Sequence, residues 1–233
     1  MRRLLLISNS THFGSGYLEH CAEQVKSFFS GCDSILFVPY ALQDLERYAQ
    51  KACDAFAAMD LSMKSCHLHA DPGSAVRATS GLFIGGGNTF RLLEKLNRFN
   101  MIDPIRKRVG EGMAYMGTSA GSNMACVSIR TTNDMPIVYP PSFSALNLVP
   151  FQINSHFVDS DPTNQHMSET RETRIAEFHE ENAEPVVGLR EGAMLVVRGE
   201  RMVLKGQNGA KLFRRGDPPL EIEIDADLSY LLG

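Results

Sequence analysis

Long apolar runs are missing from this sequence: no stretch approaches the roughly 20 apolar residues that a membrane-spanning helix needs. Met1 is followed by two arginines and a short apolar segment, Leu4 to Ile7, which together imitate the start of a signal peptide. That segment ends at Ser8, whereas the apolar region of a signal peptide has about 7 to 15 residues. We therefore expect a protein that does not enter a membrane and that stays in the cytoplasm, where it is made.

Paired cysteines are missing as well. The number of cysteines is odd and no two have the C-x-x-C spacing of zinc sites and redox centres; they are Cys21, Cys32, Cys53, Cys66 and Cys126. This pattern argues against a disulfide framework and agrees with a reducing compartment. Since the seven histidines are scattered too, we predict no metal site and no other cofactor, and we expect each cysteine to be a small buried apolar residue.

The chain also lacks the excess of basic residues that nucleic-acid binding requires. It has 23 Lys and Arg residues against 27 Asp and Glu residues, a net charge of −4, and no segment gathers the basic residues into a stripe. Nucleic acid is therefore not an expected partner. The 233 residues, of which 43% are hydrophobic, suffice for one domain with a sizeable core. Because we find no internal repeat or linker, we assign residues 1–233 to a single domain.

Short apolar segments alternate with amphipathic ones in the first half of the chain. After the first apolar segment, apolar residues recur at helical spacing. This predicts a helix with Ser15 as its N-cap and a stop at Gly31. Strands are expected at residues 3–7, 35–38, 63–68, 81–84 and 113–117. Strands that alternate with crossover helices indicate an α/β fold with a doubly wound, mostly parallel sheet, as in flavodoxin-like proteins. Ligands bind such sheets at the carboxyl ends of the strands.

The second half of the chain has a different pattern. Residues 130–144 are polar and contain three prolines, which predicts a long functional loop. A strand at 149–153 should lead to His156, and a second loop at 159–168 should precede a helix that carries Ile175 and Phe178. We expect the C-terminal part to be β-rich, with a strand at 185–189, a hairpin made by 194–197 and 202–204, and short strands near Leu212 and Ile222.

A candidate nucleophile follows the strand at 113–117. The segment Gly117-Thr118-Ser119-Ala120-Gly121 fits the G-x-S-x-G elbow, in which a sharp turn between a strand and a helix projects the serine hydroxyl. The amide of Ala120 would then lie at the start of the helix, where it can stabilise an oxyanion. The competing interpretation is a plain Gly-Ser turn without chemistry.

A glycine run, Gly85-Gly86-Gly87, ends the preceding strand and is followed by Asn88 and Thr89. Its backbone amides would lie at the same carboxyl edge of the sheet. The run lacks the lysine of a P-loop and the spacing of a dinucleotide fingerprint, so we favour a second oxyanion donor over phosphate binding or a simple connecting turn.

A serine nucleophile needs a base and a carboxylate that orients the base. Only His156 comes directly after a predicted strand end, while His166 in the second loop is a weaker competitor. Two carboxylates compete as the third member: Glu191 follows the strand at 185–189, and Asp134 lies in the long loop. The residues alone do not choose between them.

These motifs together resemble the peptidase E family of alpha-aspartyl dipeptidases. The resemblance covers nearly the whole chain, to about Gly206, and is carried by five ordered segments: residues 85–90, 117–121, 129–136, 152–157 and 169–171. It implies a serine peptidase with a fold similar to class I glutamine amidotransferase domains. It also implies an activity that removes N-terminal aspartate from dipeptides and some short peptides without a metal.

The resemblance assigns roles by position. Ser119 matches the family nucleophile, His156 the general base, and Gly87 with Ala120 the oxyanion donors. In this family the third residue has been assigned both to the glutamate matching Glu191 and to the aspartate matching Asp134; strand-end geometry favours Glu191.

The substrate of such an enzyme carries a side-chain carboxylate, for which a bidentate arginine is the natural partner. Arg171, at the start of a helix beside the His156 loop, is our candidate, and Asn88 is a further candidate for substrate binding. The expected partners are small peptides with N-terminal aspartate, and a homodimer is left open.

Two alternatives remain at this stage. A cyanophycinase-like enzyme would have a similar elbow but would act on beta-aspartyl linkages. A non-catalytic flavodoxin-like domain would use the loop from Gly85 to Asn88 to bind an anion. Amidotransferase chemistry is disfavoured because the elbow carries Ser119 where those domains use cysteine.

Overall fold

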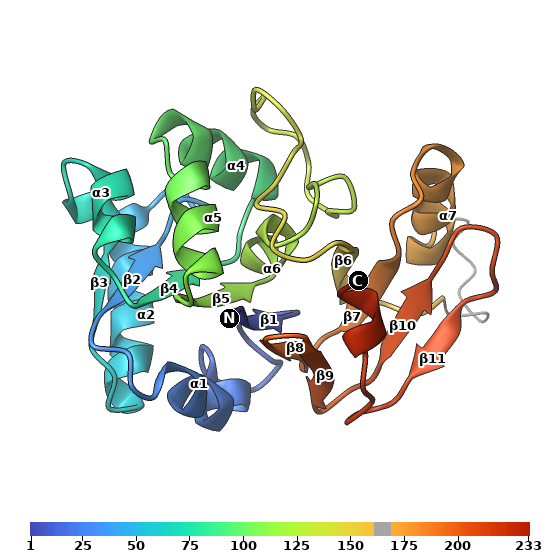
Figure 1. The fold of residues 1–233 in the computed structure, drawn as a ribbon, viewed down its shortest axis with the longest axis horizontal. Helices are drawn as coiled ribbons and strands as arrows, with labels where there is room; N and C mark the ends of the chain where they lie inside the picture. Colours follow the sequence, from blue (N-terminus) through green and yellow to red (C-terminus); the bar gives the residue numbers. More distant parts are fainter. Residues whose placement is uncertain (161–168) are drawn as a thin grey trace.

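The main element of the fold is a seven-stranded sheet, described here from a computed structural model that covers residues 1–160 and 169–233 (Figure 1). Its strand order is β3-β2-β4-β5-β1-β8-β9. The first five of these are parallel, and they comprise β3 (Met63–Ser65), β2 (Ile35–Val38), β4 (Gly81–Ile84), β5 (Ala114–Thr118) and β1 (Arg3–Ile7). The hairpin of β8 (Ala193–Arg198) and β9 (Arg201–Gly206) adds two antiparallel strands at one edge. The expected mostly parallel α/β sheet is confirmed.

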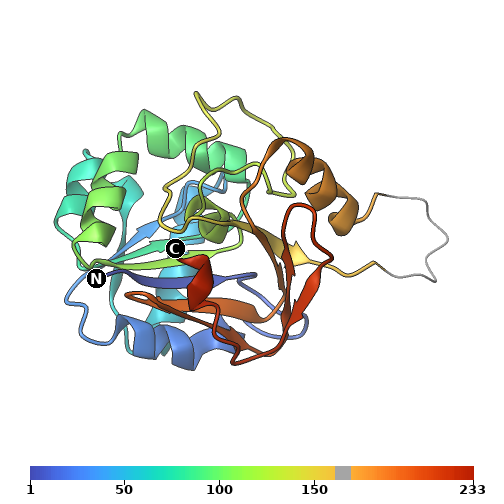
Figure 2. The ribbon, with the colours of Figure 1, turned by 45° about the vertical axis from the view of Figure 1, so that its right-hand side comes forward.

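Helices cover both faces of this sheet because the central strands are apolar on both sides. Along β1, Leu5 and Ile7 pack on one face against α1 (Ala22–Phe29) and α2 (Leu45–Ala58). Leu4 and Leu6 belong to the core on the other face, which receives α3 (Pro72–Arg77), α4 (Thr89–Arg98), α5 (Ile102–Gly110) and α6 (Ala120–Met124). Figure 2 shows the two layers, with α1 below the sheet and α4 and α5 above it.

Four strands from the second half of the chain form a separate sheet, which the sequence pattern does not distinguish from the first. Its four strands lie in the order β11-β10-β7-β6, and α7 (Arg171–Glu181) lies beside them (Figure 1). The strands are β6 (Gln152–Phe157), β7 (Val186–Arg190), β10 (Ala210–Phe213) and β11 (Leu220–Ile222). The strands on which the positions of His156 and Glu191 depend are thus β6 and β7 of a separate sheet.

Three local expectations need correction. The first helix begins at Ala22, after a 3-10 turn at Glu19–Cys21, because Leu18 adopts a left-handed φ of 62°, and the Ser15 hydroxyl donates to the carbonyl of His12 instead of capping a helix. The third strand ends at Ser65, where Cys66–Leu68 turns into a 3-10 helix. The strand expected at 149–153 is displaced to Gln152–Phe157, since Pro150 has no N–H for the ladder. His156 therefore lies inside the strand and not beyond its end.

The long loop matches its prediction, since residues 130–144 contain no helix or strand beyond a bridge between Ser128 and Ser144. Most of the second predicted loop, and His166 with it, falls at 161–168, outside the described residues. In the part of the chain that is described, no helix has the length and apolar character needed to cross a bilayer.

Candidate active site

Ser119 occupies a strained turn between β5 and α6. Its backbone has φ 51° and ψ −112°, a conformation that side-chain-bearing residues rarely adopt and that is typical of a nucleophile elbow. The Ser119 amide donates to the carbonyl of Ile7 at 2.9 Å, and its carbonyl accepts from the amides of Ser122 and Asn123. The turn is therefore fixed from both sides, and the strain is held by the surrounding hydrogen bonds.

The glycines of the elbow are required by close backbone approach. A Cβ on Gly117 would overlap the carbonyl oxygen of Gly121, and a Cβ on Gly121 would overlap that of Ile84. A Cβ on Gly86 would meet the Cβ of Ser119 at 3.1 Å. These contacts bring the glycine run after β4 directly against the serine.

His156 and Glu191 form a hydrogen-bonded relay with Ser119. The distance from Ser119 Oγ to His156 Nε2 is 3.0 Å, and the distance from His156 Nδ1 to Glu191 Oε1 is 2.7 Å. A carboxylate can only accept, so Nδ1 carries the proton and Nε2 is free to accept from the serine hydroxyl. This is the arrangement of nucleophile, base and orienting acid that acyl-transfer enzymes use.

A bulge in β6 aims the imidazole. The register against β7 shifts between Ser155 and Phe157, and His156 has a positive φ of 53°. The amide of His156 donates to the hydroxyl of Ser8 at 2.9 Å, and that hydroxyl donates to the carbonyl of Leu189 at 2.6 Å. One buried serine after β1 thus ties together the two strands of the other sheet that position the base and the acid.

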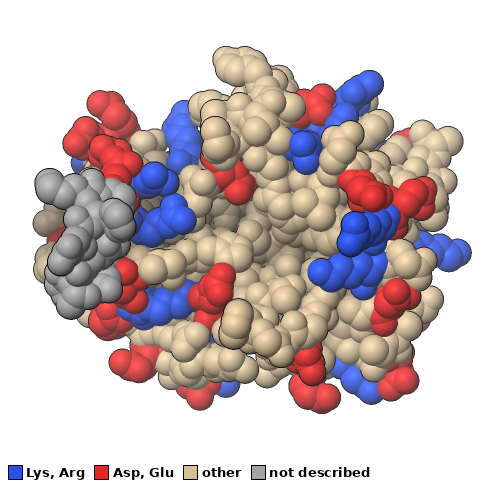
Figure 3. All heavy atoms as spheres, turned by 180° about the vertical axis from the view of Figure 1, so that it is seen from behind, with Lys and Arg blue, Asp and Glu red and all other residues tan. Residues whose placement is uncertain are grey.

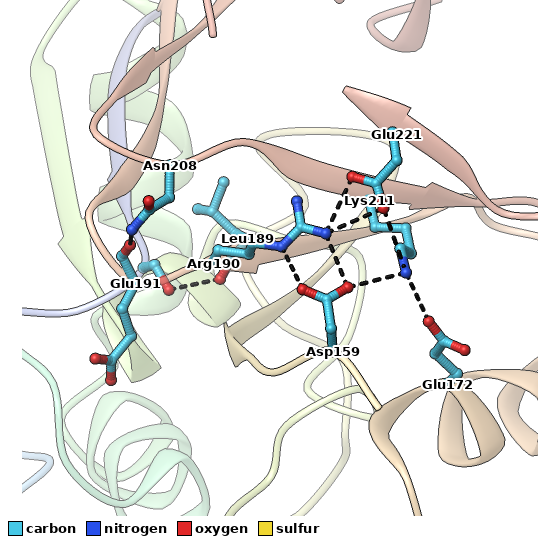
Figure 4. Close-up of polar contacts among 9 residues, drawn as sticks. Asp159, Glu172, Leu189, Arg190, Glu191, Asn208, Lys211 and Glu221 are labelled. Carbon is cyan, nitrogen blue, oxygen red and sulfur yellow. Dashed lines mark hydrogen bonds and ion pairs between the residues drawn. The ribbon is translucent and has the colours of Figure 1, made fainter. Parts of the chain in front are cut away.

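Glu191 is held by its backbone while its carboxylate stays half-exposed. Its carbonyl accepts from Nδ2 of Asn208 at 2.6 Å, and the next amide, that of Gly192, donates to Oδ1 of Asn9 at 2.7 Å. Figure 4 shows the side chains of Arg190 and Glu191 pointing away from each other, with Arg190 directed toward Asp159 and Glu221. The Glu191 carboxylate instead contacts His156.

Asp134 lies in the wall of the same cavity but makes other contacts. Its Oδ2 accepts from the amide of Thr89 at 2.8 Å, from the hydroxyl of Thr89 at 2.5 Å and from that of Thr132 at 3.1 Å. Its carboxylate joins the long loop to the start of α4, and among the described contacts it has none with His156.

The cavity at the elbow has a volume of about 740 Å³. Ser119, His156, Gly86, Gly87 and Asp134 line one end of it. Gly87 has φ 132°, and a Cβ there would lie 2.7 Å from the carbonyl oxygen of Ala41, so only glycine fits. No hydrogen bond among the described residues is donated by the amides of Gly87 or Ala120, which leaves both available to an oxyanion.

The other two sequence candidates, Asn88 and Arg171, are not among the residues that line this cavity. The Asn88 side chain accepts from the amide of Arg91 at 3.0 Å and donates to the carbonyl of Met135 at 2.8 Å, so it caps α4 and holds the long loop. The guanidinium of Arg171 donates to Oδ1 of Asn133 at 2.7 Å. Burial lowers the pKa of Arg171, with a contribution from nearby Arg174.

An ion-pair network links the ends of β6 and β7 to α7, β10 and β11. Asp159 accepts two bonds from Arg190, at 2.7 and 2.8 Å, and pairs with Lys211 at 2.9 Å, while Glu172 and Glu221 complete the network (Figure 4). The hydrogen bonds from Arg190 hold the pKa of Asp159 well below its ordinary range.

The lowered pKa of Asp159 predicts an acid-sensitive contribution to stability. A carboxyl with a depressed folded-state pKa stabilises the fold fully above its unfolded pKa, about 3.9, and loses this contribution as pH falls below that value. We expect the free energy of unfolding, measured in urea between pH 6 and pH 2.5, to fall less steeply in Asp159→Asn than in wild type. Asp33→Asn, at an exposed acid outside the network, should keep the wild-type slope; equal slopes in all three proteins would contradict the prediction.

Sequence reasoning missed several residues at this edge. Ser8 and Asn9 come directly after the buried strand β1, a position that could have identified them. The cavity also reaches the start of α2, where Asp44, Arg47 and Lys51 line it at helical spacing.

Metal-binding groups do not gather in the described residues, where no three His, Cys, Asp or Glu side chains lie close enough to hold an ion.

The face seen from behind carries acidic and basic side chains interspersed around an uncharged central region (Figure 3).

Comparisons with known proteins identify the family of this chain. Residues 4–205 match the model of peptidase family S51. Over 229 residues the chain is 50% identical to "Peptidase E" of Streptomyces coelicolor, covering 98% of this chain and 94% of that protein. It is 44% identical to the "Probable alpha-aspartyl dipeptidase" of Drosophila melanogaster over 99% of this chain and 98% of that one. A solved peptidase from an acI-B1 actinobacterium has the same fold, with a TM-score of 0.73 at 15% identity over 98% and 96% of the two chains. A family match over most of the chain, joined to relatives of nearly equal length, shows that this protein is a member of peptidase family S51.

Proposed function

We propose that this protein is a serine dipeptidase that removes N-terminal, alpha-linked aspartate from Asp-X dipeptides. The observation that carries the proposal is the relay from Ser119 through His156 to Glu191, beside two free backbone amides. The names of the Streptomyces and Drosophila relatives support the same activity.

Acylation follows from the geometry of the relay. His156 Nε2 takes the proton of the Ser119 hydroxyl as Oγ attacks the carbonyl carbon of the substrate aspartate. The imidazolium that forms is stabilised by its Nδ1–H bond to Glu191. The amides of Gly87 and Ala120 receive the oxyanion, and one such donor lowers the barrier by roughly 3 kcal/mol in related enzymes.

Departure of the amine completes acylation, and attack by water then deacylates the enzyme. As the tetrahedral intermediate collapses, the C–N bond breaks and His156 gives its proton to the leaving amine, which departs as the second amino acid. Water then occupies the vacated place, loses a proton to Nε2 and attacks the aspartyl ester. Free aspartate leaves, and the Ser119 hydroxyl regains its proton.

Arg171 is our candidate for the side-chain carboxylate of the substrate. Within the described residues its guanidinium has no carboxylate partner, and Asn133, to which it donates, adjoins Asp134 in the cavity wall. Because burial disfavours the charged form of Arg171, an anionic ligand there would be stabilising. Asn88 would contribute by holding the long loop in place beside the cavity.

A panel of dipeptides tests the proposed function. We expect the purified protein to release free amino acid from alpha-Asp-Leu, and to act at least about 100-fold less well on beta-Asp-Leu, Glu-Leu and Ala-Leu, because a charged site loses roughly 3 kcal/mol when its partner is absent or misplaced. The assays would contain EDTA. Preference for beta-Asp-Leu would favour the cyanophycinase-like alternative, and the absence of any cleavage would favour an anion-binding domain.

A further inference from the structure

One side of the cavity is built by the first turns of α2. Asp44, Arg47, Tyr48 and Lys51 all line it, at positions i, i+3, i+4 and i+7 of one helical face. This face is continuous with the wall formed by Gly86, Gly87 and Ser119. Two cationic side chains therefore lie in the same cavity as the nucleophile.

These two cations have no acidic partner among the described residues. No ion pair within residues 1–160 and 169–233 includes Arg47 or Lys51. Lys51 Nζ lies 4.7 Å from the centre of the Tyr17 ring. Asp44 is already engaged as the N-cap of α2, where its Oδ1 accepts from the amide of Arg47 at 3.0 Å. Like charges four residues apart on a helix repel each other, and a bound anion would relieve this repulsion.

The helix that carries the cations is fixed relative to the nucleophile. The hydroxyl of Tyr48 donates to the carbonyl of Gly86 at 3.1 Å and accepts from the hydroxyl of Tyr17 at 3.3 Å. Gly85 packs so closely on Tyr48 that no side chain fits between them. An anion held by Arg47 and Lys51 would thus have a defined place with respect to Ser119.

The two sides of Ser119 differ in what they offer a substrate. Asp134 belongs to the long loop, and so does Asn133, which accepts a hydrogen bond from Arg171. The residues that flank this loop, Ile129 and Ala145, pack in the core on the α4 face of the sheet. Tyr48 belongs to the core on the opposite face. If the N-terminal aspartate is held on the loop side, the second residue of the substrate extends toward α2.

We propose that Arg47 and Lys51 bind the C-terminal carboxylate of the substrate and so favour dipeptides over longer peptides. This inference depends on the proposed function, because it names the recognition of the leaving amino acid by the same site. In a dipeptide that carboxylate lies only one residue beyond the scissile bond, at most about 3.6 Å of chain, so it stays within the cavity. In a tripeptide the carboxylate is displaced by a further residue.

The test compares a substrate that has the carboxylate with one that lacks it. Values of kcat/KM would be measured for alpha-Asp-Leu and alpha-Asp-Leu amide with wild type, Arg47→Gln, Lys51→Gln and the double variant. Lys107→Gln, at an exposed lysine of α5, is the matched control for loss of one surface charge. Both Arg47 and Lys51 are exposed, so the variants should keep the wild-type circular dichroism spectrum and melting temperature.

Wild type should prefer the acid over the amide by roughly 10- to 100-fold, the usual range for a hydrogen-bonded charge. The double variant should bring this ratio close to one through a higher KM for the acid, with kcat and the turnover of the amide nearly unchanged. A ratio that stays at the wild-type value in the double variant, while alpha-Asp-Leu is still cleaved, would overturn the inference and leave the proposed function intact.

Two other results would also overturn it. Loss of discrimination between Asp-Leu and Asn-Leu in the double variant, with the acid-to-amide ratio kept, would mean that the cations bind the side-chain carboxylate. Failure of wild type to cleave either aspartyl substrate would overturn the proposed function and this inference together.

Discussion

Replacing Ser119 by alanine should reduce kcat for alpha-Asp-Leu by roughly 10⁶-fold, the loss seen when a nucleophile of this kind is removed. The hydroxyl is the only group in the relay that can form the acyl bond, and His156 has no other partner on its Nε2 side in the described structure. Release of free leucine measures turnover, and labelling by a fluorophosphonate probe reports the nucleophile independently.

The control for this variant is Ser10→Ala, which removes another hydroxyl from the lining of the same cavity. It should keep activity within a few-fold of wild type and should still react with the probe. Both variants should fold, because alanine fits the space of serine. Activity of Ser119→Ala close to the wild-type value would show that the elbow is a structural turn only.

Replacing Glu191 by glutamine should lower kcat by roughly 10³-fold with little change in KM. An amide in this position can donate to Nδ1 and so favours the wrong tautomer of His156, an effect that costs about 10⁴-fold in a fully buried triad. Because the Glu191 and His156 side chains are 49% and 41% exposed, water competes for these groups and the expected loss is smaller.

Asp134→Asn is the matched comparison for Glu191→Gln. The amide would keep the shape of the side chain but weaken the bonds to Thr89 and Thr132, so we expect a lower melting temperature and a kcat within about tenfold of wild type. The opposite ranking, with Asp134→Asn losing more of kcat than Glu191→Gln, would make Asp134 the third member. Measuring kcat and KM separately, together with the rate of probe labelling, distinguishes the two results.

The sheet and the elbow could be predicted because local patterns determine them. Continuous apolar segments such as Leu4 to Ile7 are typical of strands buried on both faces, and the backbone crossing at Gly117 and Gly121 admits no side chain. Glycine is therefore required at those two positions, and this requirement makes the elbow recognisable in the sequence.

The second sheet could not be predicted in the same way. Whether β6 and β7 extend the first sheet or form another depends on long-range pairing with β10 and β11, for which short strands of similar composition give no signal. The bulge at His156 is likewise invisible in sequence, because a positive φ is uncommon for any residue except glycine and no local pattern marks which of the seven histidines adopts it.

The wall formed by α2 was missed for a different reason. The apolar spacing of this segment identifies the face that packs on the sheet, but not what its polar residues border. Arg47 and Lys51 look like ordinary solvated residues until the fold brings the glycine run beside Tyr48.

The relay is divided between the two sheets: the nucleophile follows β5 of one, while the base lies in β6 and the acid directly follows β7 of the other. A sliding movement of about 1 Å between them would break the contact between Oγ and Nε2 without unpairing a single strand. The rate of turnover is therefore a sensitive measure of the relative position of the two sheets. A preparation with its full complement of helix and strand can still be inactive, and catalysis will fail before the fold does.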